Sequence, residues 1–291
     1  MFWKPDIVHI QSNSGYGFFE KTWISFLAKI FGCKSLIHVH GGNMREFYLH
    51  SSRVIQVLIK KSALLNDRII TGSPQMKETW ALIGIPDVKL VYVGNAVNLP
   101  QRNTKRISEN ITILFLTRVV KEKGIIELID AFTLLNKEYP NLKLRIVGAD
   151  TKDTLYVKKY LQENIGSYSI EYVGPVTDEE KMNEYLNADI FAFPTYVEDQ
   201  SYAIMEAMSY ALPCIASNVG GVPSLIKDGE NGLLIEPRNT QSLKIGLETL
   251  ICDPQLRRRL GDKARITIEE GFTWEIRSNE IKKLYEMVVL E

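Results

Sequence analysis

Short apolar segments alternate with amphipathic segments of helical period along most of the chain. In the first hundred residues the pattern predicts strands at 6–10, 35–40, 68–72 and 89–94, with helices at 17–32 and 51–65. Apolar strands with helices between them are typical of a parallel sheet that is covered on both faces. The first part of the chain is therefore predicted to be an α/β domain.

The same alternation restarts after a polar, aperiodic segment at 100–110, which we interpret as a linker. Further strands are predicted at 111–117, 142–148, 170–174, 189–195, 213–217 and 232–236. Further helices are predicted at 124–139, 156–165, 178–188, from near Ser201, at 240–251 and at 274–290. The expected organisation is an N-terminal domain at 1–99, a C-terminal domain at 111–273, and a terminal helix at 274–291 that crosses back to the N-terminal domain.

The composition is that of a soluble globular protein, with 45% hydrophobic and 24% charged residues. Its apolar segments are too short to span a membrane, and its start lacks a signal-peptide pattern, so a cytoplasmic location is expected. The three cysteines are far apart and form no CxxC pair. This spacing argues against a disulfide framework and against a structural zinc site.

Charge is distributed unevenly between the two halves of the chain. Residues 1–107 hold 14 Lys and Arg against 6 Asp and Glu, a net +8, and residues 108–291 hold 21 against 29, a net −8. The basic half suits an anionic partner, either the inner face of a membrane or a phosphorylated acceptor. A solvated basic surface is an equally good interpretation. No nucleic-acid-binding motif is present, so no nucleic acid partner is expected.

Ligands of open parallel sheets bind beyond the carboxyl ends of the strands, so polar groups in the loops there are candidates for a binding site. Arg118 and Lys123 follow the strand at 111–117 and precede a helix. Two cations beside a helix N-terminus suit a phosphate group. The alternative interpretation is a pair of ordinary solvated surface cations.

Two glutamates follow the strand at 189–195. Glu198 lies in the loop, and Glu206 lies eight positions later within an apolar helical pattern. A buried carboxylate is costly unless something pairs with it. A carboxylate at Glu206 can accept two hydrogen bonds from a vicinal diol such as a ribose, without needing a cation partner. The alternative is an ordinary exposed helix residue.

The N-terminal half offers weaker signals. Gly15 and Gly17 form a lone GxG after the first strand, which is a weak dinucleotide signal. His40 ends the second strand and precedes two glycines, so it is placed to reach a ligand. His9 and His38 are expected to pack within the sheet.

Taken together, these stretches resemble a known family. "YVEDQSYAIMEAMSYALPCIAS" (196–217) resembles the E-x7-E element of the retaining nucleotide-sugar glycosyltransferases of family four, and "RVVKEKG" resembles their arginine–lysine diphosphate clamp. "NVGGVP", "DGENGLLIEP", "VGNAVN", "KPDIVHI" and "HVHGG" resemble further signatures of that family. The resemblance covers nearly the whole chain. It implies the GT-B architecture, in which two Rossmann-like parallel-sheet domains face a cleft.

The resemblance implies roles for particular residues. Glu206 would hold the nucleotide ribose, Glu198 would contact the donor sugar, and Arg118 and Lys123 would neutralise the diphosphate. His40 matches a histidine near the donor sugar and phosphate. The implied catalytic set is His40, Arg118, Lys123 and Glu198. The implied donor-binding set is Arg118, Lys123, Thr195, Glu198, Gln200, Ser201, Tyr202 and Glu206. The chain has no DxD motif, in agreement with the family's metal-independent chemistry, so neither a metal nor a cofactor is expected.

The chain also departs from the family pattern. Asp199–Tyr202 replace the usual glycine, aromatic, glycine run, and Ser224 stands where a glutamate usually follows "GGVP". The chain begins almost at the "KPDIVHI" strand, so the N-terminal domain is expected to be incomplete and that strand to have an open edge. A partner chain or self-association would cover such an edge.

The implied function is transfer of a sugar, with retention of configuration, from a nucleotide-diphosphate donor to a glycan, lipid-linked or other acceptor. Cell-envelope or polysaccharide synthesis is the expected setting. The alternative is a non-catalytic or partner-dependent chain that binds a nucleotide sugar. A nicotinamide dehydrogenase is disfavoured, because it needs an acidic residue where His40 ends the second strand.

Overall fold

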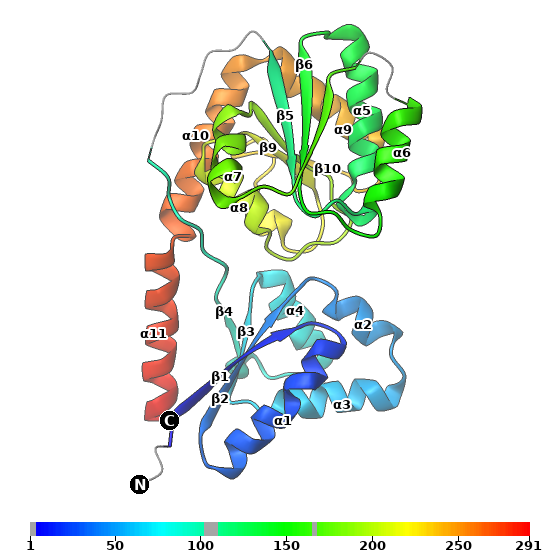
Figure 1. Ribbon diagram of the computed structural model, residues 1–291. Coiled ribbons are helices and arrows are strands. Elements are labelled where there is room, and N and C mark those ends of the chain that lie inside the picture. The colour runs from blue at the N-terminus through cyan, green and yellow to red at the C-terminus, as the bar shows by residue number, and fades with distance from the viewer. Residues whose placement is uncertain (1–3, 102–109, 165–167) are drawn as a thin grey trace. The chain divides into compact units, whose positions relative to one another are not determined.

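The computed structural model describes residues 4–101, 110–164 and 168–291, so most of the predicted linker lies outside the described residues. Its contacts divide the chain into two compact units, shown in Figure 1. Unit 1 comprises Met1–Ala96, Glu198–Gln200 and Trp274–Glu291, and unit 2 comprises Val97–Val197 and Ser201–Thr273.

Unit 1 contains a sheet of four parallel strands in the order β1-β2-β3-β4. The strands are β1 (Ile7–Asn13), β2 (Lys34–His40), β3 (Arg68–Thr71) and β4 (Leu90–Tyr92). The helices are α1 (Tyr16–Ile30), α2 (Met44–His50), α3 (Arg53–Leu64), α4 (Pro74–Ile83) and, from the end of the chain, α11 (Trp274–Leu290). Among the described residues, β1 ends the sheet and pairs with β2 alone.

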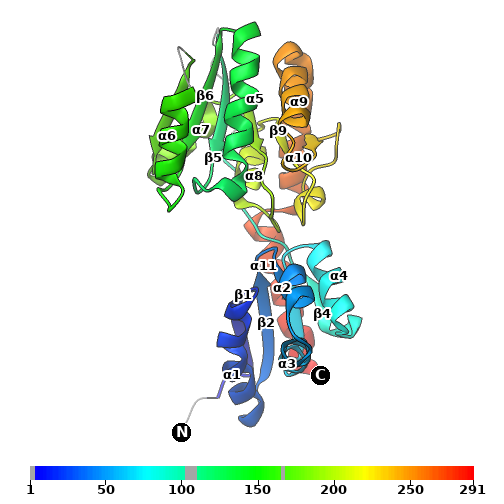
Figure 2. The same cartoon turned by 90° about the vertical axis from the view of Figure 1, so that its right-hand side faces the viewer.

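Alternate strand residues of unit 1 enter two separate cores. Ile37 and Ile69 pack with α1 to α4 on one face of the sheet, around the buried Trp80. Their neighbours Leu36 and Ile70 pack on the other face with Leu284 and Val288 of α11. The period of two follows from the pleat of a strand, which points successive side chains to opposite faces. Figure 2 shows α11 and α1 on different sides of the sheet.

Unit 2 contains a six-stranded parallel sheet in the order β10-β9-β8-β5-β6-β7. The strands are β5 (Ile111–Leu116), β6 (Leu142–Val147), β7 (Ile170–Gly174), β8 (Ile190–Phe193), β9 (Cys214–Ser217) and β10 (Leu233–Ile235). The helices are α5 (Ile125–Glu138), α6 (Thr154–Asn164), α7 (Asp178–Asn187), α8 (Tyr202–Ser209), α9 (Thr240–Cys252) and α10 (Pro254–Gly271).

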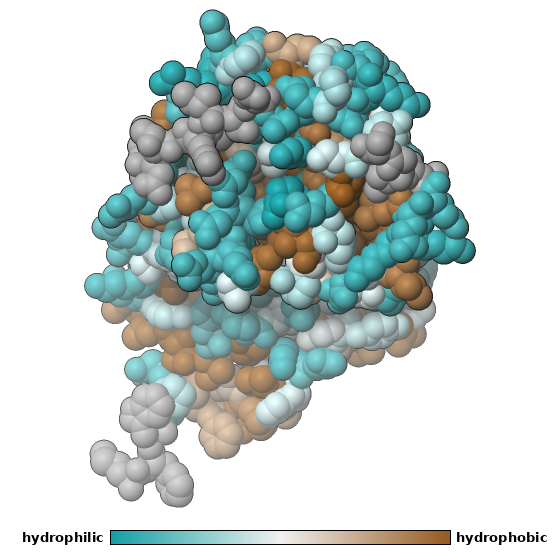
Figure 3. Space-filling model, turned by 45° about the horizontal axis from the view of Figure 1, so that its top comes forward, coloured by the Kyte–Doolittle hydropathy of each residue, from teal (hydrophilic) through white to brown (hydrophobic). Residues whose placement is uncertain are grey.

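The central strands β8 and β9 of unit 2 are buried on both faces, as continuous apolar runs predict. Phe115 and Ile190 enter one core with α5, α6 and α9. Leu114 and Phe191 enter the other core with α7, α8 and α10. Hydrophilic side chains cover much of the outer surface of unit 2 that comes forward in Figure 3. The predicted fold class, two Rossmann-like parallel sheets, is confirmed.

The apolar pattern of the sequence did not predict three of the helices. These are α2, α4 and α10. Local start signals nevertheless precede two of them, because Ser73 caps α4 before Pro74, and Asp253 caps α10 before Pro254. No described helix is both long enough and apolar enough to cross a membrane.

Candidate functional site

The order of strands in unit 2 creates a topological switch point between β5 and β8. From β5 the chain moves to β6 and β7 on one side, and then returns to β8 on the other side. The loops that leave β5 and β8 therefore run in opposite directions from the same sheet edge. This divergence opens the crevice in which open α/β sheets bind ligands.

The loops after β5 and β8 are bonded to each other. The backbone N–H of Tyr196 donates to the carbonyl of Glu122 at 2.8 Å, and the buried Thr195 hydroxyl donates to the same carbonyl at 3.3 Å. These bonds fix the two loop segments 117–124 and 194–197 as neighbours within unit 2.

Gly124 makes this close approach sterically feasible. Its φ is 73°, and a Cβ on it would lie 1.9 Å from the carbonyl oxygen of Pro194. A side chain is therefore excluded here by backbone angle and by contact. Gly124 also caps α5, so the helix begins directly beside the loop after β8.

The two predicted clamp cations lie on the β5 loop. Arg118 is exposed just beyond β5, and the partly buried Lys123 ends a short 3-10 helix at Lys121–Lys123. The Lys123 Nζ stands 5.1 Å from the centroid of the Phe193 ring, at the end of β8. Lys123 therefore lies toward the strand β8 as well as on its own loop, where a ligand at the switch point would meet it.

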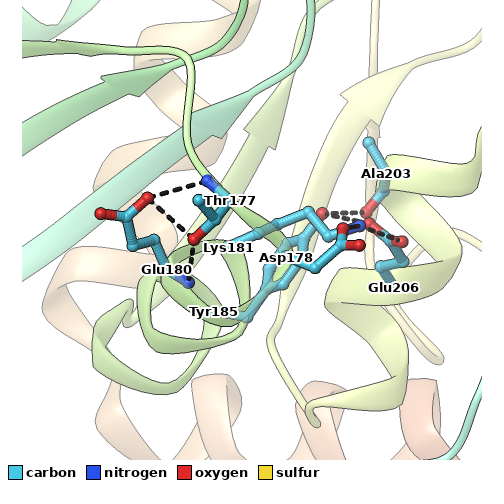
Figure 4. A network of polar contacts seen from close by, with 7 residues as sticks. All are labelled: Thr177, Asp178, Glu180, Lys181, Tyr185, Ala203 and Glu206. Carbon is cyan, nitrogen blue, oxygen red and sulfur yellow. Dashed lines mark hydrogen bonds and ion pairs between the residues drawn. The ribbon is translucent and has the colours of Figure 1, made fainter.

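Glu206 lies on α8, which begins at the N-cap Ser201, with Tyr202 exposed in its first turn. Its carboxylate accepts hydrogen bonds from Lys181 Nζ to Oε1 and from Tyr185 Oη to Oε2, each at 2.9 Å (Figure 4). Glu206 therefore has a cation partner, Lys181, although binding a diol would not need one. Its helix neighbours are apolar, but the partners come from α7, which tertiary packing places beside α8. With its side chain 27% exposed, Glu206 is also not an ordinary surface residue.

The two partners of Glu206 stay protonated at neutral pH. Partial burial lowers the pKa of Lys181, but the hydrogen bond and charge of Glu206 outweigh this effect and raise it overall. Burial, followed by the negative charge of Glu206, raises the pKa of the Tyr185 phenol well above its usual value. Both groups are therefore hydrogen-bond donors to the carboxylate.

The short segment Glu198–Gln200 groups with unit 1. The Asn95 Nδ2 donates to the carbonyl of Gln200 at 2.8 Å, and the Ser73 hydroxyl donates to the buried Asp199 carboxylate. Burial raises the pKa of Asp199 to about 6; the Ser73 bond opposes this rise and the charge of Glu198 adds to it. Glu198 is partly buried, and its Oε1 accepts from the N–H of Asp199 at 3.2 Å.

His40 ends β2 in unit 1 and belongs to a ladder of three histidines. The His38 and His40 rings stack at 4.2 Å between centroids, and the His9 and His38 rings stack at 5.7 Å. The His40 Nε2 bonds to the Gln11 Oε1 at 2.7 Å. Burial, followed by the neighbouring histidines, lowers the pKa of His38 to about 3, and burial also lowers that of His40. His38 is packed in the sheet, as the sequence predicts.

Sequence reasoning missed Lys181 and Tyr185, which are the two partners of Glu206. Their spacing of four residues on a predicted helix would have placed both on one face. It would not have shown which helix that face meets. Among the described residues, no cluster of three or more His, Cys, Asp or Glu is arranged to hold a metal ion. The prediction of metal-independent chemistry remains a prediction.

The chain is similar in sequence to a known family and to individual known proteins. The family described as "Glycosyl transferases group 1" matches residues 98–267. The capsular polysaccharide biosynthesis glycosyltransferase CapM of Staphylococcus aureus is 29% identical over 196 residues, which cover 66% of this chain and 50% of CapM. The chain thus aligns with half the length of this relative.

Two solved structures share the fold over almost all of the chain. Sucrose-phosphate synthase from Thermosynechococcus elongatus is 21% identical with a TM-score of 0.84, covering 97% of this chain and 73% of that one. Anabaena HepE, solved with UDP and glucose, is 18% identical with a TM-score of 0.81, covering 97% of this chain and 77% of that one. At these identities the likeness concerns the fold.

Proposed function

Because this chain belongs to the glycosyl transferases group 1 family, we propose that it transfers a sugar from a nucleotide-diphosphate donor to an acceptor hydroxyl. We propose retention of configuration, and a glycan or lipid-linked acceptor in cell-envelope or polysaccharide synthesis. Two similar proteins support this proposal. CapM is named for capsular polysaccharide biosynthesis, and HepE was solved with UDP and glucose.

One observation carries the proposal. At the switch point of unit 2, the loop with Arg118 and Lys123 is bonded to the loop that leads into α8 and Glu206. Cations suit a diphosphate, and a carboxylate suits the two hydroxyls of a ribose. A nucleotide diphosphate presents these groups in that order along one molecule.

In the proposed reaction, the bond between the sugar C1 and the diphosphate oxygen breaks, and its electron pair stays on the diphosphate. An acceptor hydroxyl oxygen forms the new bond to C1, and its proton passes to the departing diphosphate or to solvent. Arg118 and Lys123 would stabilise the negative charge that develops on the leaving group. The products are the glycosylated acceptor and the nucleoside diphosphate.

The remaining predicted residues have supporting roles in this proposal. Glu198 and His40 would contact the donor sugar, and Thr195, Gln200, Ser201 and Tyr202 would line the donor. The buried Thr195 hydroxyl is already engaged with the β5 loop, which suits a residue that shapes the loop. No metal or cofactor is proposed.

We further propose that unit 1 rests on an anionic membrane surface at the inner face of the membrane. The outward face of α1 exposes Trp23, Phe26 and Ile30, whose side chains are 60%, 55% and 60% exposed. Lys21 and Lys29 flank these apolar residues on the same helix. An apolar stripe with cations beside it suits a surface of acyl chains and anionic headgroups. A lipid-linked acceptor would be encountered there.

The proposal is tested with a panel of nucleoside diphosphates and nucleotide sugars in the presence of EDTA. One of them should raise the temperature of thermal unfolding. At a hundred times its dissociation constant, that ligand should add roughly 2.7 kcal/mol to the free energy of unfolding. Release of the nucleoside diphosphate from the matching sugar nucleotide is then measured with candidate acceptors. Binding with no turnover would favour the non-catalytic alternative, and no binding by any member would refute the proposal.

A further inference from the structure

The N-terminus of α7 is fixed by a complete capping box. The Thr177 hydroxyl accepts from the backbone N–H of Glu180 at 3.3 Å, and the Glu180 carboxylate accepts from the Thr177 N–H at 2.8 Å (Figure 4). Reciprocal bonds of this kind hold the first turn of a helix in place. Lys181 follows directly, so its backbone is anchored close to a rigid helix end.

Lys181 and Tyr185 lie four residues apart on α7 and point to the same neighbour. Each donates to a different oxygen of the Glu206 carboxylate at 2.9 Å. The Tyr185 ring is buried and stacks on Tyr210 at 5.3 Å between centroids, so its hydroxyl has little freedom to move. The plane and direction of the carboxylate are therefore set from α7.

The carboxylate keeps unused capacity after these two bonds. Each carboxylate oxygen has about two acceptor sites, and the two hydrogen bonds from α7 use one on each oxygen. Each oxygen can therefore accept one further hydrogen bond, and two adjacent hydroxyls of a ligand would supply the two donors. The Lys181 charge also offsets the cost of holding the Glu206 charge away from bulk water.

We propose that Lys181 and Tyr185 are positioning residues that hold Glu206 in the orientation that recognises the two hydroxyls of a ribonucleotide. This inference rests on the proposed function. Neither residue touches the ligand in this account; both act through the Glu206 carboxylate. Without them the carboxylate would turn freely, and its preference for a ribose over a 2′-deoxyribose would fall.

Calorimetric titration with UDP, GDP and ADP and with their 2′-deoxy counterparts tests this inference. The wild-type protein should bind one ribonucleotide roughly tenfold more tightly than its deoxy form. The reason is that the deoxy form lacks the 2′-hydroxyl and so loses a hydrogen bond to the charged Glu206 carboxylate. Lys181→Met and Tyr185→Phe should each bring that ratio close to one. Lys181→Arg should restore most of the ratio, because a guanidinium also donates to a carboxylate.

Lys244→Met is the matched control. Lys244 is a partly buried lysine of unit 2 that pairs with Glu248 at 3.3 Å, on helix α9, which packs in the other core of unit 2 from α8. Its removal deletes a comparable ion pair and should leave the ratio of ribonucleotide to deoxyribonucleotide affinity unchanged.

The outcomes separate the two proposals. If the wild-type protein binds a ribonucleotide but Lys181→Met keeps its affinity and ratio, or binds more tightly, the positioning role is refuted alone. If the wild-type protein binds no nucleotide, the proposed function and this inference both fail. Should Lys181→Met not fold, Tyr185→Phe decides, because it keeps the packed ring and removes only the hydroxyl.

Discussion

The α-carbon of Gly124 lies so close to Pro194 that a Cβ would stand 1.9 Å from the Pro194 carbonyl oxygen. This approach joins the loop that carries Arg118 and Lys123 to the loop that leads into α8. Two properties of the position exclude a side chain, the contact itself and a φ of 73°. The geometry of the candidate diphosphate site therefore depends on one hydrogen atom in place of a methyl group.

Gly124→Ala should destabilise unit 2 and weaken nucleotide diphosphate binding together. Left-handed backbone costs a non-glycine residue about 1–2 kcal/mol, and the clash adds to this. Chemical denaturation and calorimetry measure the two effects. Gly271→Ala is the control, because a Cβ there has no neighbour within 4 Å. An unchanged free energy of unfolding in Gly124→Ala would contradict the described loop geometry.

Arg118→Ala should weaken binding of a nucleoside diphosphate roughly tenfold or more while leaving the bare nucleoside almost unaffected. The reason is that a guanidinium interacts with phosphate oxygens and not with the base. Calorimetry with both ligands gives the comparison. Arg258→Ala, at a side chain 88% exposed on α10, removes the same charge elsewhere in unit 2. Equal losses for the two ligands would show that Arg118 does not contact the diphosphate.

The histidine ladder of unit 1 should make the protein less stable in acid. The folded pKa of His38, about 3, lies below its ordinary value of 6.5, and burial is the main cause. The unfolded chain therefore binds protons first as the pH falls. The stabilising contribution is complete above pH 6.5 and is lost progressively as the pH falls toward 3.

Denaturation midpoints measured between pH 8 and pH 4 test this sign. His38→Gln should flatten the decline, whereas His50→Gln, at an exposed position on α2, should not. Within the ladder, His38 stacks on His9 and His40. The ladder is bonded to Gln11 and to Tyr285, whose Oη lies 2.5 Å from the His9 Nδ1. A decline of the same slope in His38→Gln and the wild-type protein would exclude the ladder as its source.

The outward face of α1 should determine membrane binding. Trp23→Ser combined with Phe26→Ser should abolish co-sedimentation with vesicles that contain phosphatidylglycerol, because both side chains would otherwise enter the lipid interface. Leu155→Ser is the control, at an apolar side chain 79% exposed on α6 of unit 2. If wild-type protein remains in the supernatant with these vesicles, the membrane proposal is wrong.

Much of the fold follows from local patterns in the sequence. Strands such as β5 and β6 are apolar runs, and helices such as α5 and α9 carry apolar residues at helical spacing. The spacing of apolar residues and the turn residues between segments therefore identify these elements. Their parallel pairing follows from the helices that connect them. The loops after β5 and β8 follow the carboxyl ends of their strands, as the apolar pattern predicts, and Arg118 and Lys123 lie on the first of them. That a ligand binds there stays a prediction.

These local patterns could not predict which side chains of different helices and strands contact one another. Lys181 stands 25 positions before Glu206, and its contact depends on how α7 and α8 pack across β8. The histidine ladder depends on the register of β1 and β2, in which Gln11 pairs with His38 and Asn13 with His40. Register and helix packing are properties of the assembled core, and no single segment of the sequence encodes them.

The most direct measurement is a crystal structure of the protein with the nucleoside diphosphate that stabilises it most. The diphosphate should lie within hydrogen-bonding distance of Arg118 and Lys123. Both ribose hydroxyls should donate to Glu206 while Lys181 and Tyr185 keep their bonds to it. A nucleotide bound away from the β5 and β8 loops, or one whose ribose does not touch Glu206, would contradict the central claim.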